Sequence, residues 1–222
     1  MNPQQTFDLI RLDLERNANP IKSVGMKKYM KDQSEFLGIS SPERKAIGKE
    51  WLKVSWENES ENFAFFRLFW DAPFREFHYF GLEWAHKQKL WKSKNFLKVM
   101  EHCIESRPWW DTLDFLAANW AGNFFATFPE LKEEVLPRWI SHQHFWFNRV
   151  AILHQLTYKS KTEVQWLEKS ILPHTEKKEF FIRKAIGWSL RQYARTAPDW
   201  VQEFVQKHPL SGLSKREALK HL

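Results

Sequence analysis

Apolar residues recur along this chain at intervals of three and four positions, the spacing that places them on one face of an α-helix. Few runs alternate between apolar and polar residues with the two-residue period of a strand. Prolines followed by acidic residues, as in Ser41-Pro42-Glu43 and Ala197-Pro198-Asp199, mark helix starts, because the first turn leaves its N–H groups unused. The pattern predicts an all-α protein with helices near residues 5–16, 23–32, 41–54, 60–70, 73–88, 93–105, 109–127, 129–140, 145–156, 162–172, 177–195 and 198–207, and a short one after Ser214.

The predicted helices follow one another with short connections. Pairs of them recur at roughly 35 to 45 residues, which is the spacing of HEAT-like helical hairpins. We therefore expect a right-handed or irregular α-solenoid of HEAT-like hairpins with a concave basic groove. A compact irregular helical bundle is the alternative. Because no linker or low-complexity segment interrupts the pattern, we expect a single domain over residues 1–222.

Basic residues are concentrated near the end of the chain. The whole sequence holds 34 Lys and Arg against 27 Asp and Glu, a net charge of +7. Residues 177–222 alone hold ten Lys or Arg and four Asp or Glu, a net +6. Such a concentration favours a polyanionic partner. A solvated basic surface without a partner is the alternative.

The remaining composition narrows the class of protein further. One cysteine excludes an intramolecular disulfide and a cysteine-based metal cluster, and it fits a reducing compartment. The first eight residues lack the apolar core of a signal sequence, and no window reaches the length of a membrane span. We expect a cytoplasmic protein without a membrane segment, metal or cofactor. Four histidines have no metal-ligand spacing to nearby carboxylates: His102, His142, His144 and His154.

The segment from Pro108 onward carries the most informative side chains. Pro108 is expected to open a helix that runs through Trp120 and beyond. On it Trp110 and Asp114 share a face at the i, i+4 spacing, which suits holding a planar cation between an indole ring and a carboxylate. The alternatives are a core tryptophan and a solvated or capping acid. A different face of the helix is apolar and predicts core: Trp109, Leu113, Leu116 and Trp120.

Two further features favour a phosphate-bearing partner. In the helix predicted over 177–195, one face combines a tryptophan with three cations, although surface packing could also explain it: Lys184, Trp188, Arg191 and Arg195. Arg149 occupies an apolar position of its own helix, so its guanidinium needs an acceptor. That acceptor could be Asp114, Asp111 or a DNA phosphate bound in bidentate fashion.

These motifs, taken in order, resemble the AlkD-type DNA alkylation repair family of HEAT-like-repeat DNA glycosylases. The resemblance rests on Trp110-Asp111-Thr112-Leu113-Asp114 and on the segments 148–153, 179–191 and 213–221. The early residues 28–31, 36–39 and 42–44 match as well, so the resemblance spans nearly the whole chain. It departs from the family's usual sequence at 115–120, and lesion preference therefore does not follow from it.

The resemblance implies roles for individual residues. Asp114 would be the catalytic carboxylate, with Trp110 and Trp188 flanking the damaged nucleoside. Arg149 would contact the DNA backbone beside the lesion, and Tyr29 would line the same cleft. The family needs no metal or cofactor and leaves the lesion stacked in the duplex instead of flipping it. Five further cations are expected to contact DNA: Lys184, Arg191, Arg195, Lys215 and Arg216.

We therefore expect a monofunctional glycosylase, acting as a monomer, that hydrolyses the N-glycosidic bond of N3-methyladenine and N7-methylguanine in duplex DNA. Asp114 could stabilise positive charge on the sugar or position the attacking water, and the sequence does not separate these roles. One alternative is a non-catalytic binder of damaged or distorted DNA on the same fold. Another is a helical-repeat scaffold for protein partners, which the basic end of the chain disfavours.

Overall fold

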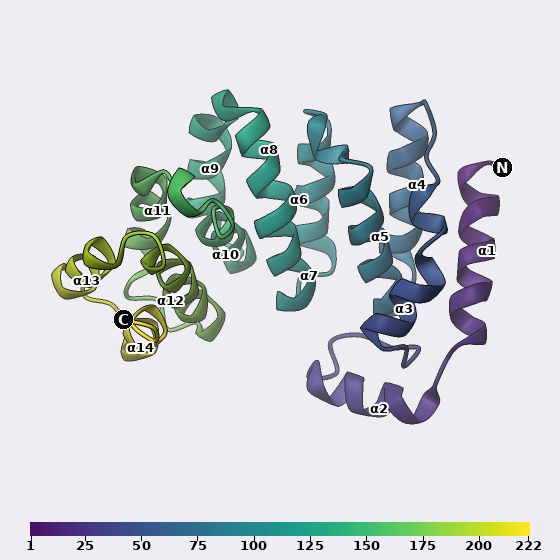
Figure 1. The fold of residues 1–222 in the computed structure, drawn as a ribbon, viewed down its shortest axis with the longest axis horizontal. Coiled ribbons are helices and arrows are strands. Elements are labelled where there is room, and N and C mark those ends of the chain that lie inside the picture. The colour runs from purple at the N-terminus through teal and green to yellow at the C-terminus, as the bar shows by residue number, and fades with distance from the viewer. The chain divides into compact units, whose positions relative to one another are not determined.

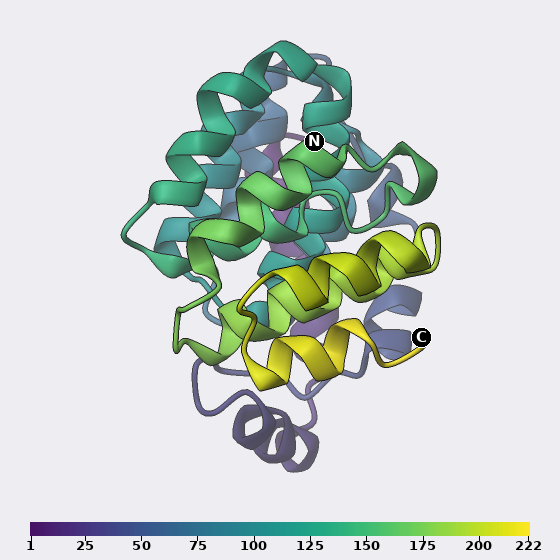
Figure 2. The ribbon, with the colours of Figure 1, turned by 90° about the vertical axis from the view of Figure 1, so that its left-hand side faces the viewer.

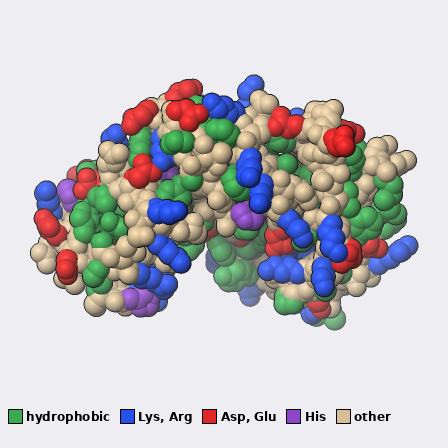
Figure 3. All heavy atoms as spheres, turned by 45° about the horizontal axis from the view of Figure 1, so that its top comes forward, with side chains coloured by type: hydrophobic (Ala, Val, Ile, Leu, Met, Phe, Trp, Pro, Cys, Tyr) green, Lys and Arg blue, Asp and Glu red, His purple; other side chains and the backbone are tan.

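The computed structural model describes all residues, 1–222, and they fold into helices without a named strand. The chain divides into two compact units, residues 1–90 and 91–222. The predicted all-α fold is confirmed, whereas the concave groove and the single domain stay predictions. No helix has the length and apolar character needed to cross a membrane. Figure 3 shows Lys and Arg side chains on the surface of both units.

Unit 1 consists of helices that pack both on the next helix of the chain and on helices further along it (Figure 1). Its elements are α1 (Pro3–Arg16), α2 (Pro20–Tyr29), α3 (Ser41–Gly48), η1 (Trp51–Lys53), α4 (Glu59–Asp71) and α5 (Arg75–Lys87). Asparagine and serine side chains cap α1 and α3 in reciprocal capping boxes, which satisfy N–H groups that the first turn leaves open. Helix α2 is the exception in packing, since none of its residues is buried.

The core of unit 1 consists largely of aromatic rings, and one buried carboxylate attaches a loop to α5. Phe65 and Phe69 of α4 are fully buried and meet edge to face at 5.0 Å between ring centroids. Glu76 of α5 accepts hydrogen bonds from the backbone N–H groups of Leu37, Gly38 and Ile39 at 2.9, 2.9 and 3.1 Å. This carboxylate ties the loop before α3 to α5, because buried N–H groups require acceptors.

Unit 2 also consists of successive helices. After η2 (Leu90–Lys92), which spans the boundary, come α6 (Phe96–Ser106), α7 (Trp110–Phe115), η3 (Leu116–Ala121), α8 (Gly122–Thr127), η4 (Pro129–Leu131), α9 (Lys132–Ser141), α10 (Phe145–Leu153), η5 (Lys159–Lys161), α11 (Val164–Ile171), η6 (Leu172–His174), α12 (Phe180–Ala194), α13 (Pro198–Lys207) and α14 (Gly212–Ala218). Helix α10 packs on both α9 and α12, so it connects the early and late parts of the unit.

The helix predicted from Pro108 differs from the structure in two ways. It begins at Trp110, with Trp109 as the extended N-cap residue, so Pro108 lies just outside it. The segment η3 is a π-helical turn, which separates α7 from α8. A π turn leaves backbone carbonyls without their usual α-helical partners. The Thr157 hydroxyl donates to the carbonyl of Ala118 at 3.3 Å, and the Asn119 amide donates to that of Phe115 at 3.0 Å.

Candidate active site

The candidate carboxylate lies on α7, one turn after the tryptophan that begins this helix. Trp110 is half-buried, and the Asp114 side chain is 14% exposed. Trp109, the N-cap, packs its ring edge to face on Phe181 at 5.2 Å and on Trp146 at 5.8 Å. This aromatic contact fixes the start of α7 against α10 and α12. Both tryptophans are half-buried, although Trp109 was predicted to lie in the core.

Arg149 of α10 is paired with Asp114. Its Nε donates to Oδ1 and its Nη2 donates to Oδ2, both at 2.8 Å, and its Nη1 donates to the backbone carbonyl of Phe181. The Arg149 side chain is only 5% exposed. Of the three acceptors that the sequence left open, the structure selects Asp114. The bidentate geometry fixes both carboxylate oxygens, because the planar guanidinium presents its donors in a rigid fork.

Burial raises the pKa of Asp114 above its ordinary value, because the surrounding protein disfavours the charged form. The charge and hydrogen bonds of Arg149 act in the opposite direction, and the nearby charge of Asp111 adds to the increase. Asp111 lies in the first turn of α7, where a carboxylate also interacts favourably with the helix dipole. The candidate site thus holds a carboxylate whose ionised form depends on one arginine.

Trp188 lies on α12, the helix that accepts the third hydrogen bond of Arg149. It is half-buried and follows Phe181 by seven residues, which places both on one face about 10 Å apart along the axis. The structure therefore links Asp114 on α7 to α12 through Arg149. Tyr29 ends α2 in unit 1 and is 69% exposed.

The predicted DNA-binding cations fall into two groups. Lys184 and Arg191 both donate to Glu217 of α14, at 2.8 and 2.7 Å respectively. Arg195 and Arg216 are exposed, and Lys215 is half-buried. Figure 2 shows α14 lying beside α12, and these two helices share an extensive contact. Glu217 was not predicted from the sequence. It is 26 positions from Arg191 and 33 positions from Lys184, and pairs so far apart leave no periodic signal.

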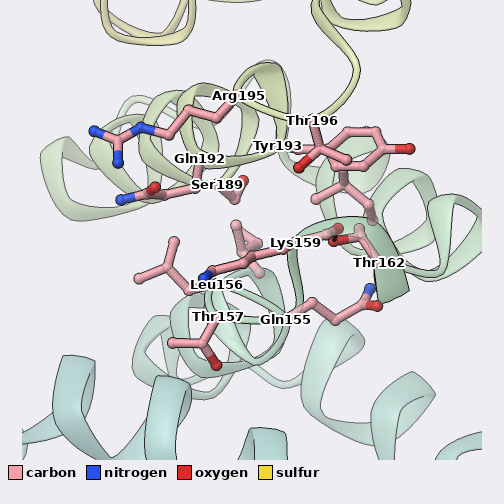
Figure 4. Close-up of a pocket in the computed structure, with 12 residues that line it drawn as sticks. Gln155, Leu156, Thr157, Lys159, Thr162, Ser189, Gln192, Tyr193, Arg195 and Thr196 are labelled. Atoms are coloured by element: carbon pink, nitrogen blue, oxygen red, sulfur yellow. Dashed lines mark hydrogen bonds between the residues drawn. The ribbon is translucent and has the colours of Figure 1, made fainter.

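A cavity of about 350 Å³ lies beside the C-terminal half of α12. It is lined by residues of α10, α11, α12 and the loop before α11, including Leu156, Lys159, Gln192 and Arg195. Figure 4 shows the ends of Lys159, Gln192 and Arg195 extending toward the same side. Trp110, Asp114 and Trp188 are not among its lining residues, so the cavity is separate from the candidate catalytic group. No group of three His, Cys, Asp or Glu side chains is arranged to hold a metal ion.

Comparison with known proteins defines the class. Residues 10–222 match the family model described as DNA alkylation repair enzyme. A solved structure described as a predicted DNA alkylation repair enzyme from Enterococcus faecalis is 34% identical, with a TM-score of 0.86 over 92% of this chain and 96% of that chain. No curated protein matches.

The fold is therefore that of an all-helical DNA repair protein. The chain belongs to the DNA alkylation repair enzyme family. The resemblance that the sequence motifs indicated is confirmed.

Proposed function

We propose that the protein is a monofunctional DNA glycosylase that excises N3-methyladenine and N7-methylguanine from duplex DNA. One observation carries the proposal. The Asp114 carboxylate is nearly buried, fixed at both oxygens by Arg149, and one helical turn from the half-buried Trp110. A fixed charge in a largely water-excluded place stabilises developing positive charge more strongly than the same charge in water.

The substrate class follows from this chemistry. A purine alkylated at N3 or N7 is cationic, so it leaves readily once the bond between C1′ and the base nitrogen breaks. The bonding electron pair goes to the purine, which departs neutral, and the sugar becomes oxocarbenium-like. Water then adds to C1′ and loses a proton. The negative Asp114 stabilises the sugar cation, and the indole faces of Trp110 and Trp188 supply cation–π attraction.

Arg149 has two roles in this proposal. Its charge and hydrogen bonds favour the ionised form of Asp114, and its guanidinium is oriented by the carboxylate and by the carbonyl of Phe181. Three of its N–H groups already donate to Asp114 and Phe181 and the side chain is 5% exposed, so a phosphate of the damaged strand has only the remaining N–H groups to bind. Loss of Arg149 therefore affects DNA binding and the rate of excision together, whereas loss of the Asp114 charge affects mainly the rate.

The test is release of free base from a duplex that contains one N7-methylguanine. We expect the wild-type protein to release the base in a single-turnover assay and Asp114→Asn to release it at least 10²-fold more slowly, an electrostatic effect of about 2.7 kcal/mol. Glu203→Asn, which removes an exposed carboxylate on α13, serves as the control. No release by the wild type, with tight binding to the same duplex retained, favours the non-catalytic binder.

A further inference from the structure

We infer that Glu217 is a specificity-determining residue that competes with DNA phosphates for Lys184 and Arg191 and so weakens binding to undamaged duplex. The inference rests on the proposed function for its substrate, DNA. Its central observation is that one carboxylate holds two cations on the helix that carries Trp188. The Lys184 Nζ donates to one oxygen of Glu217 at 2.8 Å, and the Arg191 Nη1 donates to the other at 2.7 Å.

Glu217 is ionised when it holds these cations. The hydrogen bond from Lys184 lowers the pKa of Glu217, and the charges of Lys184 and Arg191 lower it further. The Glu217 side chain is 18% exposed, compared with 38% for Lys184 and 20% for Arg191. The two cations therefore remain within reach of solvent, and of a phosphate, while the carboxylate neutralises much of their charge.

The position of the two cations beside Trp188 explains why their pairing with Glu217 affects DNA binding. Lys184 precedes Trp188 by four residues and Arg191 follows it by three, so the helix presents them on the same face. A backbone phosphate bound beside Trp188 lies within reach of these two donors. While Glu217 holds them, a phosphate has to displace a carboxylate before it gains a charge-assisted hydrogen bond.

Packing of α14 against α12 keeps the carboxylate in place. Gly187 immediately precedes Trp188 in the sequence. A Cβ atom at this glycine would lie 2.4 Å from the Cβ of Glu217 and 2.9 Å from the backbone oxygen of Ser214. The Ser214 hydroxyl donates to the carbonyl of Arg183 at 3.0 Å, which adds a second point of attachment. The close packing of the α12 and α14 backbones therefore fixes the position of Glu217, and Glu217→Gln removes the charge of this side chain without moving it.

Glu217 is expected to weaken binding to undamaged duplex more than binding at a lesion. On undamaged duplex, phosphate contacts supply nearly all the affinity, so competition from Glu217 reduces binding directly. At a lesion, attraction between the cationic base and the indole and carboxylate groups adds affinity that does not pass through these two cations. Glu217 therefore raises the ratio of damaged to undamaged binding.

The test compares Glu217→Gln with Glu203→Gln, which makes the same change in net charge at an exposed position of α13. Affinity for an undamaged duplex is measured over a series of KCl concentrations. Each phosphate contact makes the slope of log K against log salt more negative by roughly 0.9. We expect Glu217→Gln to bind at least tenfold more tightly at low salt and to steepen the slope by about 1 to 2, with little change for Glu203→Gln.

Equal slopes in the two variants would overturn the inference. If Glu217→Gln fails to fold, Lys184→Gln in the wild-type background tests the same point against Lys215→Gln. Removing a cation that Glu217 already holds is expected to change the slope by less than removing Lys215. Binding to undamaged duplex requires no excision, so either outcome is independent of base release and leaves the proposed glycosylase activity separately testable.

Discussion

At the scale of single residues, the pair of Asp114 and Arg149 defines the candidate site. The apolar spacing around Arg149 showed that its guanidinium would be buried and need an acceptor. The spacing could not choose among Asp114, Asp111 and a phosphate, because the choice depends on how α7, α10 and α12 pack. The structure makes the choice through two 2.8 Å hydrogen bonds.

The first prediction concerns the pH dependence of excision. Asp114 has a pKa raised by burial and held down by Arg149, so excision is expected to fall as the pH drops through that pKa. Arg149→Met removes the lowering influence and moves the acid midpoint to higher pH. Asp111→Asn removes a raising influence and moves it to lower pH. Single-turnover rates measured against pH test both shifts, and midpoints that move together contradict the assignment.

The second prediction concerns stability, and its sign follows from linkage. Because the pKa of Asp114 is higher in the folded protein, the stabilisation that comes from protonating this carboxyl group is fully present below the unfolded pKa and is lost as the pH rises through the folded pKa; the pairing with Arg149 is a separate contribution that requires the ionised form. Asp114 can take up a proton if Arg149 is removed, whereas Arg149 stays charged if Asp114 is removed.

We therefore expect Asp114→Ala to lower the free energy of unfolding by about 3 to 5 kcal/mol at neutral pH, because it leaves a buried charge without a partner. Arg149→Met is expected to lower it by less, and by a diminishing amount toward low pH. Urea unfolding of both variants at several pH values is the measurement. A larger loss for Arg149→Met at low pH than at neutral pH would count against this account.

At the scale of elements, sequence periodicity identified nearly every helix but could not show how α12 meets α14. Gly187 looks unremarkable within α12, yet the close approach of α14 leaves no room for a side chain there. Nor could periodicity reveal the π turn at 116–121, because Leu116 and Trp120 are fully buried in the position that an uninterrupted helix also predicts. Contacts between segments decide both features.

The third prediction tests the packing of α14. Gly187→Ala places a methyl group against the backbone of Ser214 and the Cβ of Glu217. Overpacking of this kind costs about 1 to 3 kcal/mol, even though alanine favours a helix. Gly212→Ala in α14 is the control, because no atom lies within 4 Å of the added carbon. Denaturant midpoints should fall for the first variant and hold or rise for the second.

At the scale of the whole molecule, the sequence alone indicated the family, because several motifs occur in the expected order over most of the chain. It also indicated the basic character of the C-terminal region. What it could not indicate is how much of that charge is available. Of the five cations predicted to contact DNA outside the Arg149 site, Glu217 holds two. Net charge counts residues, whereas binding depends on which of them are already paired.

The fourth prediction concerns the salt dependence of DNA binding. If Lys184, Arg191, Arg195, Lys215 and Arg216 all reach phosphates, log K is expected to fall with log salt at a slope of about −4.5, a loss of roughly 500-fold between 50 and 200 mM KCl. Competition by Glu217 makes the observed slope shallower. Fluorescence anisotropy with an undamaged duplex measures it, and affinity that does not vary with salt favours a protein scaffold.

The π turn between α7 and α8 has a consequence for how this region can change in length. Removing one residue from an ordinary helix rotates everything beyond it by about 100° and misaligns the buried face. A π turn already contains one residue more than an α turn, so shortening Leu116–Ala121 by one residue can convert it to regular helix while both flanking faces keep their register. The chain therefore contains, beginning at Leu116 shortly after Asp114, a segment from which one residue can be deleted without displacing the carboxylate.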